Sequence, residues 1–249
     1  MQIYGDFIKM NEIFIRTAQI LGEDGFQKLQ NASVAVFGIG GVGSHCAEAL
    51  ARSGVGTLFL IDSDVVAPSN INRQSIALIS TIGRRKTDVI KEKIADINPD
   101  CKVILCDSFV LPDNMEEVFA HFPGKLDYII DAIDTVSAKL ALVSYANEHD
   151  IPIICSMGTG NKLHPEMFKI ADIYKTNVCP LCRVMRRELK KLDISHLKVL
   201  YSEELPRTPQ TTGEEKSSGR PAPASIAFVP PVAGLLLAGE VIRKISGIS

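Results

Sequence analysis

The chain has 249 residues, with 27 Lys and Arg against 29 Asp and Glu, and 46% of its residues are hydrophobic. This composition is that of a globular protein with a sizeable apolar core, and it excludes a chain that is disordered throughout. The net charge of −2 excludes general tight binding to nucleic acid, which needs a strong basic excess, but it leaves room for a local basic patch.

The sequence carries no pattern typical of secretion or membrane insertion. The first 14 residues include acidic side chains and lack a long apolar core. The longest apolar stretch, at 227–239, contains two prolines and is well short of the ~20 residues that span a bilayer. Six cysteines are too few and too scattered for a disulfide framework. We therefore expect a cytoplasmic protein with reduced thiols.

Strand and helix patterns alternate along the first part of the chain. Strands are predicted at 33–37, 57–61, 103–106, 127–132 and 151–155, and helices at 42–52, 85–97 and 139–149. This alternation is typical of a parallel sheet with helices on both faces. The sequence therefore predicts an α/β, Rossmann-like doubly wound fold with a mostly parallel sheet.

The pattern becomes less regular in the second part. Further strands are predicted at 168–173 and 198–201, and helices at 180–192 and 232–245. Residues 203–224 are rich in Pro, Gly, Ser, Thr and charge, which predicts a flexible loop. We expect a single domain over 1–249, with a nucleotide-binding core at 12–175 and a C-terminal extension at 176–249 that carries this loop.

A glycine-rich turn, GIGGVG at 38–43, follows the first predicted strand and opens a helix. Glycines let the backbone turn tightly and approach a phosphate, and the helix N-terminus offers N–H groups and a positive dipole to the anion. Asp62 ends the next strand, where a carboxylate can accept hydrogen bonds from ribose hydroxyls. A glycine turn without a ligand is the alternative, but the strand, the helix and the acid together favour a nucleotide site.

The polar loop after Asp62 favours a triphosphate over a nicotinamide cofactor. It brings together Asp64, Asn70, Arg73 and Gln74, and Lys86 follows shortly after. Cations near phosphates suit a reaction that stabilises transferred charge, whereas hydride transfer has little use for them. Taken singly, Asn70 or Arg73 would be interpreted as a turn cap or a surface ion pair. The GxxxxGK[ST] motif is absent from the sequence, which excludes a Walker-type NTPase.

These motifs, taken in order, resemble those of a known family. The segments are GIGGVG, DSDVVAPSNINRQ (62–74), the helix beginning near Arg85 and Lys86, and DAIDT (131–135). They are similar to the ATP-dependent activating enzymes related to ubiquitin-activating enzymes and to ThiF, MoeB and HesA. Members adenylate a carboxylate with release of pyrophosphate. The resemblance covers roughly residues 12–175.

Within that group the chain is most similar to the dehydratases that act on threonylcarbamoyladenosine in tRNA. The supporting segments lie at 16–25, 48–56, 70–74, 95–101, 127–135, 170–176 and 227–242. The resemblance implies a homodimeric enzyme that uses ATP and magnesium to adenylate the carboxylate of the modified adenosine. It then closes a ring, with release of AMP and loss of water. The implied partner is tRNA carrying that nucleoside.

The resemblance also assigns roles to individual residues. It implies that Arg73, Lys86 and Asp134 are catalytic and that Asp134 positions magnesium. The implied ATP ligands are Gly38, Gly40, Gly41, Gly43, Asp62, Asp64, Asn70, Arg73, Gln74 and Lys86. Helix N-capping is the alternative for Asp134 and the favoured interpretation for Asp131. Arg16 is expected to reach the ATP site of a neighbouring subunit.

Cys179 and Cys182 form a single CxxC pair at the start of a predicted helix. Structural zinc needs four ligands, so one pair does not complete a site and zinc is not expected. Two unreactive thiols on the first helical turn are the favoured interpretation. The alternative is a reactive pair with a redox or sulfur-transfer partner, because a helix start lowers a thiol pKa.

The helix after CPLC carries a basic face made of Arg183, Arg186, Arg187, Lys190 and Lys191. One interpretation is a contact for tRNA phosphates, which the inferred substrate favours. The other is a solvated helix face paired with Glu188 and Glu203.

Three other functions stay open. An enzyme that activates the C-terminus of a ubiquitin-like sulfur-carrier protein would share the ATP site, although the single CxxC pair argues against it. A nicotinamide-dependent oxidoreductase would share the fold and would bind the reduced cofactor. A catalytically inactive adaptor would have lost Arg73, Lys86 or Asp134, all of which are present.

Overall fold

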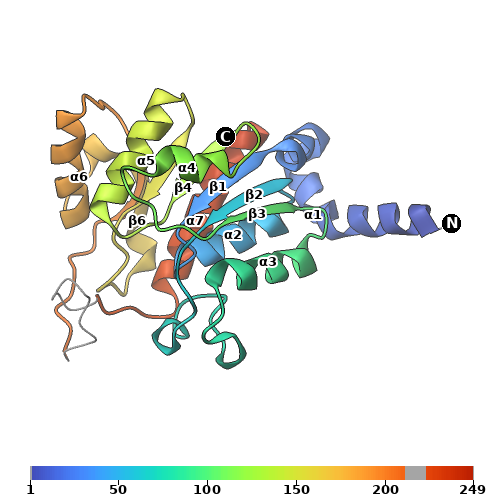
Figure 1. Ribbon diagram of the computed structural model, residues 1–249, viewed down its shortest axis with the longest axis horizontal. Coiled ribbons are helices and arrows are strands. Elements are labelled where there is room, and N and C mark those ends of the chain that lie inside the picture. The colour runs from blue at the N-terminus through green and yellow to red at the C-terminus, as the bar shows by residue number, and fades with distance from the viewer. Residues whose placement is uncertain (1, 211–222, 249) are drawn as a thin grey trace.

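The computed structural model describes residues 2–210 and 223–248, with side chains from residue 12 onward. Part of the loop expected at 203–224, namely 211–222, lies outside the described residues. A twisted sheet occupies the centre of the molecule (Figure 1). In the described part of the chain it has seven strands: β1 Ser33–Phe37, β2 Thr57–Ile61, β3 Lys102–Cys106, β4 Tyr128–Asp131, β5 Ile153–Ser156, β6 Phe168–Asp172 and β7 Lys198–Ser202.

The strands follow the order β3-β2-β1-β4-β5-β7-β6, and every neighbouring pair is parallel except β6 with β7. From the central pair β1 and β4, the chain continues to β2 and β3 on one side of the sheet and to β5, β7 and β6 on the other. The loops that leave β1 and β4 therefore run in opposite directions. Such a switch point leaves a crevice at the carboxyl edge of the sheet, where ligands bind in open α/β folds. The predicted doubly wound, mostly parallel sheet is confirmed. It continues without a break through β6 and β7.

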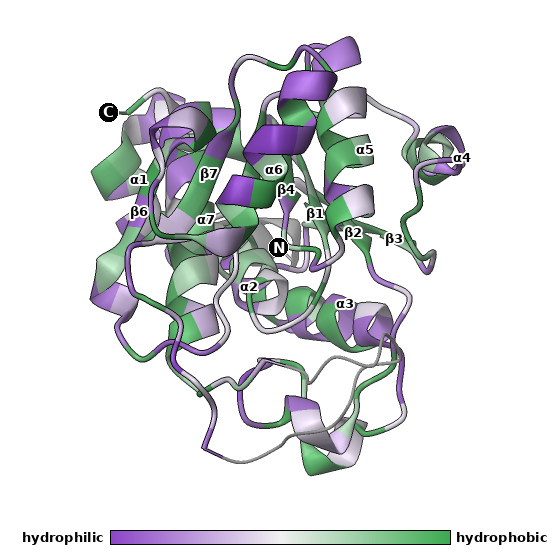
Figure 2. Ribbon diagram, turned by 90° about the vertical axis from the view of Figure 1, so that its left-hand side faces the viewer, coloured by the Kyte–Doolittle hydropathy of each residue, from purple (hydrophilic) through white to green (hydrophobic). Residues whose placement is uncertain are grey.

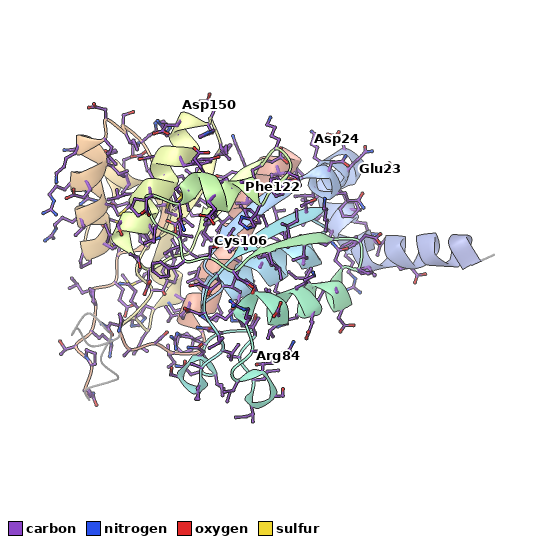
Figure 3. The ribbon with its side chains drawn as sticks, in the orientation of Figure 1. Glu23, Asp24, Arg84, Cys106, Phe122 and Asp150 are labelled. Carbon is purple, nitrogen blue, oxygen red and sulfur yellow. The ribbon has the colours of Figure 1, made fainter. Side chains whose placement is uncertain are left out.

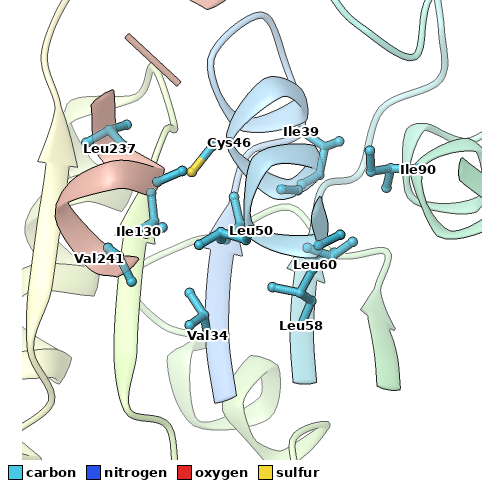
Figure 4. Packing of buried hydrophobic residues seen from close by; sticks show 14 of the residues in the cluster. Val34, Ile39, Cys46, Leu50, Leu58, Leu60, Ile90, Ile130, Leu237 and Val241 are labelled. Atoms are coloured by element: carbon cyan, nitrogen blue, oxygen red, sulfur yellow. The ribbon is translucent and has the colours of Figure 1, made fainter. Parts of the chain in front are cut away.

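Helices cover both faces of the sheet. One face packs against α2 Gly43–Arg52, α3 Lys86–Ile97 and α7 Val229–Ser246, and the other against α4 Met115–Ala120, α5 Val136–Glu148 and α6 Pro180–Lys191. Side chains alternate along each strand, so Val34 and Val36 point to the first face and Ala35 and Phe37 to the second. Figure 4 shows residues of the first of these cores, and the central strands β1 and β2 consist mostly of hydrophobic residues (Figure 2).

The sequence did not predict α1, Gln2–Asn31, or the short helix α4. Two features of α1 explain the omission. Gly22 adopts a φ of 69° and a ψ of 165°, which kinks the helix. Ile13 and Ile20 are 51% and 78% exposed, so the apolar spacing does not follow one buried face. The N-terminal half of α1 projects from the body of the molecule in Figure 1.

The last described helix, α7, lies close against the first helix of the sheet, α2. Gly234 makes this possible, since a Cβ there would overlap the carbonyl oxygen of Val42 and lie 3.0 Å from the Cys46 nitrogen. Pro230 sits in the first turn of α7, where no intrahelical N–H is required. No helix within 2–210 or 223–248 has the length and apolarity needed to cross a membrane.

Candidate active site

A cavity of about 540 Å³ opens at the carboxyl edge of the sheet, around the switch point between β1 and β4. Its walls come from the glycine loop after β1, the loop after β2, the loops after β4 and β5, the first turn of α6 and residues 223–230. Cys106 marks this edge at the end of β3 in Figure 3, and its carbonyl accepts from the Asp62 N–H at 3.3 Å.

Two of the loop glycines are required by the backbone itself. Gly38 has a φ of +88°, and a Cβ there would come 2.8 Å from the Ala132 oxygen. A Cβ on Gly43 would overlap the Gly38 carbonyl. Gly40 differs, because its Cβ position faces open space with only the Gln74 Nε2 at 3.9 Å. Gly40 therefore keeps room for a ligand against the backbone.

Asp62 organises the loops on either side of the cavity. Its Oδ2 accepts from the Ile39 N–H at 2.6 Å and its Oδ1 from the Asp64 N–H at 2.8 Å. The Lys86 ammonium, which is 5% exposed, lies 2.7 Å from the Asp64 carboxylate and 3.8 Å from that of Asp62. Burial raises the pKa of Asp62, and the Lys86 charge and these amides oppose the rise. The result is a preorganised, charged wall.

The loop that carries Arg73 is held by its own backbone. The Arg73 Nη1 donates to the Ser69 carbonyl and to the Asn72 Oδ1, both at 2.8 Å. The Asn70 Oδ1 accepts from the Ala67 N–H at 3.1 Å, so this oxygen caps a turn. His45 Nε2 lies 3.2 Å from the Arg73 carbonyl, and burial lowers the pKa of this imidazole. Arg73 and Asn70 both line the cavity.

Two buried polar atoms on the cavity wall have no hydrogen-bond partner among the described residues: the Gln74 Oε1 and the Ser225 Oγ. Gln74 is 7% exposed, and an unpartnered polar atom at such depth is costly unless a ligand or water satisfies it. With the open space at Gly40, these atoms fit a polar, phosphate-bearing ligand. The sequence analysis missed Ser225, which lies in no motif and reaches the cavity because Asn72 Nδ2 donates to its carbonyl at 3.1 Å.

A fully buried ion pair supports the wall formed by the loops after β4 and β5. The Lys139 Nζ lies 2.9 Å from the Asp131 Oδ2 and donates to the Ser156 carbonyl at 2.8 Å, and both charged side chains are 0% exposed. The other Asp131 oxygen accepts from the Ile133 N–H at 3.0 Å. The N-cap interpretation of Asp131 is therefore wrong: Thr135 occupies the N-cap of α5, and Asp131 ties two strand ends together.

Replacement of Lys139 by methionine should lower the free energy of unfolding by about 3–5 kcal/mol, because it leaves the Asp131 carboxylate buried without its cation. Adding Asp131→Asn to this variant should recover much of the loss. Urea unfolding of the three proteins measures both effects. A loss below about 1 kcal/mol in the single variant would contradict the structural role given to the pair.

Asp134 lies on the loop beyond β4, exposed at the cavity, and its Oδ1 lies 3.4 Å from the Thr135 Oγ1. Carboxylate oxygens of this kind suit a hard cation such as Mg²⁺. The position is compatible with metal binding next to the glycine loop.

The first turn of α6 borders the cavity through Leu181. Of the basic residues on this helix, Arg183, Arg187, Lys190 and Lys191 are exposed. Arg186 is different, since its Nη1 donates to the Ile173 and Thr176 carbonyls at 3.1 Å each and also contacts the Thr176 hydroxyl.

Glu188 pairs with the basic face of α6, as the second interpretation expects, but Glu203 does not. Glu188 pairs with Arg187 and with Lys191 at 2.7 Å each, whereas Glu203 pairs with Lys169 on β6. Arg16 is exposed on α1 and does not line the cavity.

Most of the amino-acid sequence matches a known protein family. A family model described as the ThiF family aligns with residues 14–249, which is most of the chain. The chain belongs to the ThiF family. The glycine loop, Asp62, Arg73 and Lys86 described above all lie within the ThiF match.

The chain is similar over much of its length to two proteins named as tRNA-modifying enzymes. The tRNA threonylcarbamoyladenosine dehydratase of Bacillus subtilis is 44% identical over 241 residues, which is 93% of this chain and 94% of the relative. The enzyme of the same name from Escherichia coli is 42% identical over 174 residues, 70% of this chain and 64% of the relative.

Solved structures agree with these matches. The crystal structure of the Escherichia coli tRNA N6-threonylcarbamoyladenosine dehydratase in complex with AMP superimposes with a TM-score of 0.86 at 33% identity, and it covers 95% of each chain. The complex of that enzyme with ATP gives a TM-score of 0.85 over the same share. The nucleotide complexes belong to a protein whose fold is that of this ThiF chain.

Proposed function

We infer that this chain is an ATP-dependent dehydratase that adenylates the carboxylate of threonylcarbamoyladenosine in tRNA and cyclises it. The observation that carries this inference is the match to the Bacillus subtilis dehydratase over nearly the full length of both chains. The cavity supports it, because a glycine loop, two buried unpartnered polar atoms and the Lys86 cation together fit a nucleotide.

The proposed reaction has two steps, adenylation of the substrate carboxylate and ring closure. A carboxylate oxygen of the substrate attacks the α-phosphorus of ATP, the bond to the β-phosphate oxygen breaks, and pyrophosphate leaves. A nitrogen of the substrate then attacks the acyl carbon, the bond from that carbon to the AMP oxygen breaks, AMP leaves, and the nitrogen loses its proton to water as the ring closes. Lys86 and Arg73 neutralise the charge that develops on the phosphate oxygens. The fixed amides of the glycine loop orient the phosphates without rearrangement.

We propose that Asp134 holds magnesium beside the phosphates. Magnesium supplies neutralisation of charge on phosphate oxygens when it is bound. Replacement of Asp134 by asparagine should raise the magnesium concentration needed for half-maximal AMP release at least about tenfold, because one charged ligand is lost. A titration of activity against MgCl₂ measures this, and an unchanged midpoint would remove the assignment.

Release of AMP and pyrophosphate from ATP tests the proposed reaction directly. It should require tRNA that carries threonylcarbamoyladenosine, and mass analysis should show a nucleoside product lighter by one water. Unmodified tRNA is the matched control. Turnover without the modified tRNA, together with an adenylate on the C-terminus of a sulfur-carrier protein, would move the chain to the alternative function and leave the ATP site in place.

We also propose that the exposed basic face of α6 contacts tRNA phosphates. The helix starts at the cavity wall, and Arg183, Arg187 and Lys190 point outward from it. Arg186 is a poorer probe, because it holds the backbone before the helix.

The double reversal Arg183→Glu with Arg187→Glu should weaken tRNA binding by at least tenfold. The slope of log Kd against log salt should fall by about one for each phosphate that the protein no longer neutralises. Affinity for ATP should not change. Filter binding over a range of salt concentrations measures these quantities, and Lys125→Glu, at an exposed lysine before β4, is the control. Equal tRNA affinity in the double variant and the control would exclude this face.

We propose a homodimer in which Arg16 serves the ATP site of the partner subunit. Large apolar side chains on α1, after β2 and on α7 are exposed in the single chain, including Ile20 at 78% and Ile79 at 80%. A partner subunit packed against them would remove this apolar surface from water. Mixing the inactive variants Arg16→Ala and Lys86→Met tests the proposal, since a mixed dimer regains one intact site only if Arg16 acts across subunits. Recovery of no activity from a mixture proven to exchange subunits would overturn it.

A further inference from the structure

Cys179 and Cys182 lie on one side of the first turn of α6. Cys179 is the N-cap residue, Pro180 occupies the first helical position, and Cys182 follows one turn later. The two side chains are 4% and 0% exposed and carry free thiols. Residues three apart on a helix project in the same direction, so the sulfurs are neighbours.

The surroundings of Cys179 favour its thiolate. The adjacent Cys182 thiol is the largest cause that lowers the pKa of Cys179, and burial opposes it. The backbone amides of Leu181 and Cys182 and the Lys162 ammonium lower that pKa further. Lys162 is 5% exposed and fixed by donation to the Glu204 carbonyl at 2.7 Å. A thiol at a helix N-terminus beside a lysine is the usual setting of a reactive cysteine.

The pKa of the second thiol, Cys182, shifts in the opposite direction. The neighbouring Cys179 and burial both raise the pKa of Cys182, so this sulfur keeps its proton while Cys179 is ionised. One ionised and one protonated sulfur in a CxxC turn are the arrangement of an attacking and a resolving thiol.

Three of the other four cysteines illustrate the contrast with this setting. Burial raises the pKa of Cys46, Cys101 and Cys155, and among the described residues no adjacent thiol offsets that rise as Cys182 does for Cys179. They lie in α2, before β3 and in β5 without a neighbouring thiol in their turn. Their environment is that of inert core thiols.

We propose that Cys179 and Cys182 are a reactive dithiol that a low-molecular-weight disulfide, such as oxidised glutathione, converts into an intramolecular disulfide on the cavity wall. The Cys179 thiolate attacks one sulfur of the oxidant, whose S–S bond breaks, and the leaving thiolate takes a proton from water. The Cys182 thiol then attacks the mixed disulfide at Cys179 and passes its proton to the second leaving thiolate. Two cysteine thiols are oxidised and one disulfide is reduced to two thiols.

The position of the pair connects this reaction to the cavity. Leu181 stands between the two cysteines and lines the cavity, and Met157, on the loop after β5, packs in the same apolar cluster as both sulfurs. A bridge across residues 179–182 therefore forms directly behind the wall on the side of β4 and β5. The expected consequence is a shift of Leu181 and a change in the cavity, not in the Asp62 side of the nucleotide site.

Peptide mapping of the intact protein tests the proposal without any substitution. After incubation with oxidised glutathione, alkylation under denaturing conditions should label four of the six cysteines, and the unlabelled pair should map to a 179–182 disulfide. Dithiothreitol should restore all six. In Cys182→Ser the product should instead be a mixed disulfide of glutathione at Cys179, whereas Cys101→Ser, the matched control, should still form the bridge.

Two results would overturn the proposal. One is full alkylation of Cys179 and Cys182 after oxidation of folded protein, as expected of inert thiols. The other is a bridge that maps to different cysteines. Both are read from the native sequence, so a variant that fails to fold leaves the test intact.

Discussion

Lys86→Met is expected to reduce ATP-dependent turnover by about 10²–10³-fold, because the variant loses a preorganised cation where phosphate charge develops. The ammonium sits between the Asp62 and Asp64 carboxylates and is 5% exposed. Its loss also leaves two carboxylates facing the phosphates, which adds repulsion to the lost attraction. AMP release measures turnover, and isothermal titration measures ATP affinity.

Lys91→Met provides the control for this variant, since Lys91 lies on the same helix but is exposed and does not line the cavity. It should retain full activity. Because Asp64 is largely exposed and the buried Asp62 carboxylate keeps the Ile39 and Asp64 N–H donors, we expect Lys86→Met to remain folded, and circular dichroism checks this. Turnover within a factor of three of the unmodified protein would contradict the role of Lys86 at the phosphates.

Gly43→Ala should lower the stability of the fold, whereas Gly40→Ala should lower the affinity for ATP. A Cβ at Gly43 overlaps the Gly38 carbonyl, so the variant should lose about 3 kcal/mol or more of stability. A Cβ at Gly40 meets no atom closer than the Gln74 Nε2 at 3.9 Å, so that variant should keep its melting temperature. It should still lose at least tenfold in ATP affinity, since the methyl group occupies the space of a phosphate.

Calorimetry and ATP titration of the two variants separate fold from binding. The informative comparison is between melting temperature and affinity in the same protein. Normal ATP affinity in a stable Gly40→Ala protein would show that the phosphates do not approach this part of the loop. A stable Gly43→Ala protein would show that the loop can rearrange.

The sequence analysis succeeded where a local pattern dictates structure. Runs such as 33–37 and 57–61 are apolar because both faces of the sheet are covered, and their predicted bounds agree with β1 and β2. The glycines at 38 and 43 carry a steric demand that is visible in the motif. The order of the strands in the sheet is harder to predict from the sequence, although the rule that parallel strands are joined by short, right-handed crossovers leaves few possible orders.

Features that depend on distant contacts could not be predicted in this way. Ser225 lies on the cavity wall because distant residues hold its backbone: Asn72 donates to its carbonyl, and Asn161 bonds to the neighbouring Ala224. Asp131 was interpreted as a cap because its partner, Lys139, is hidden in an ordinary helical pattern, and only the fold shows that both are buried. Likewise α1 has apolar residues that face outward, so its spacing gave no clear period.

The contact between Gly234 of α7 and the first turn of α2 has a consequence for biosynthesis. The ribosome makes the glycine loop early and α7 long after it, so a nascent chain that ends before Val229 has the loop without the helix that holds it. We expect such chains to bind no ATP and to depend on chaperones until α7 emerges. Chains ending at 228 and at 249, both released from the ribosome, should therefore differ sharply in protease resistance, and equal resistance would show that the loop is assembled without α7.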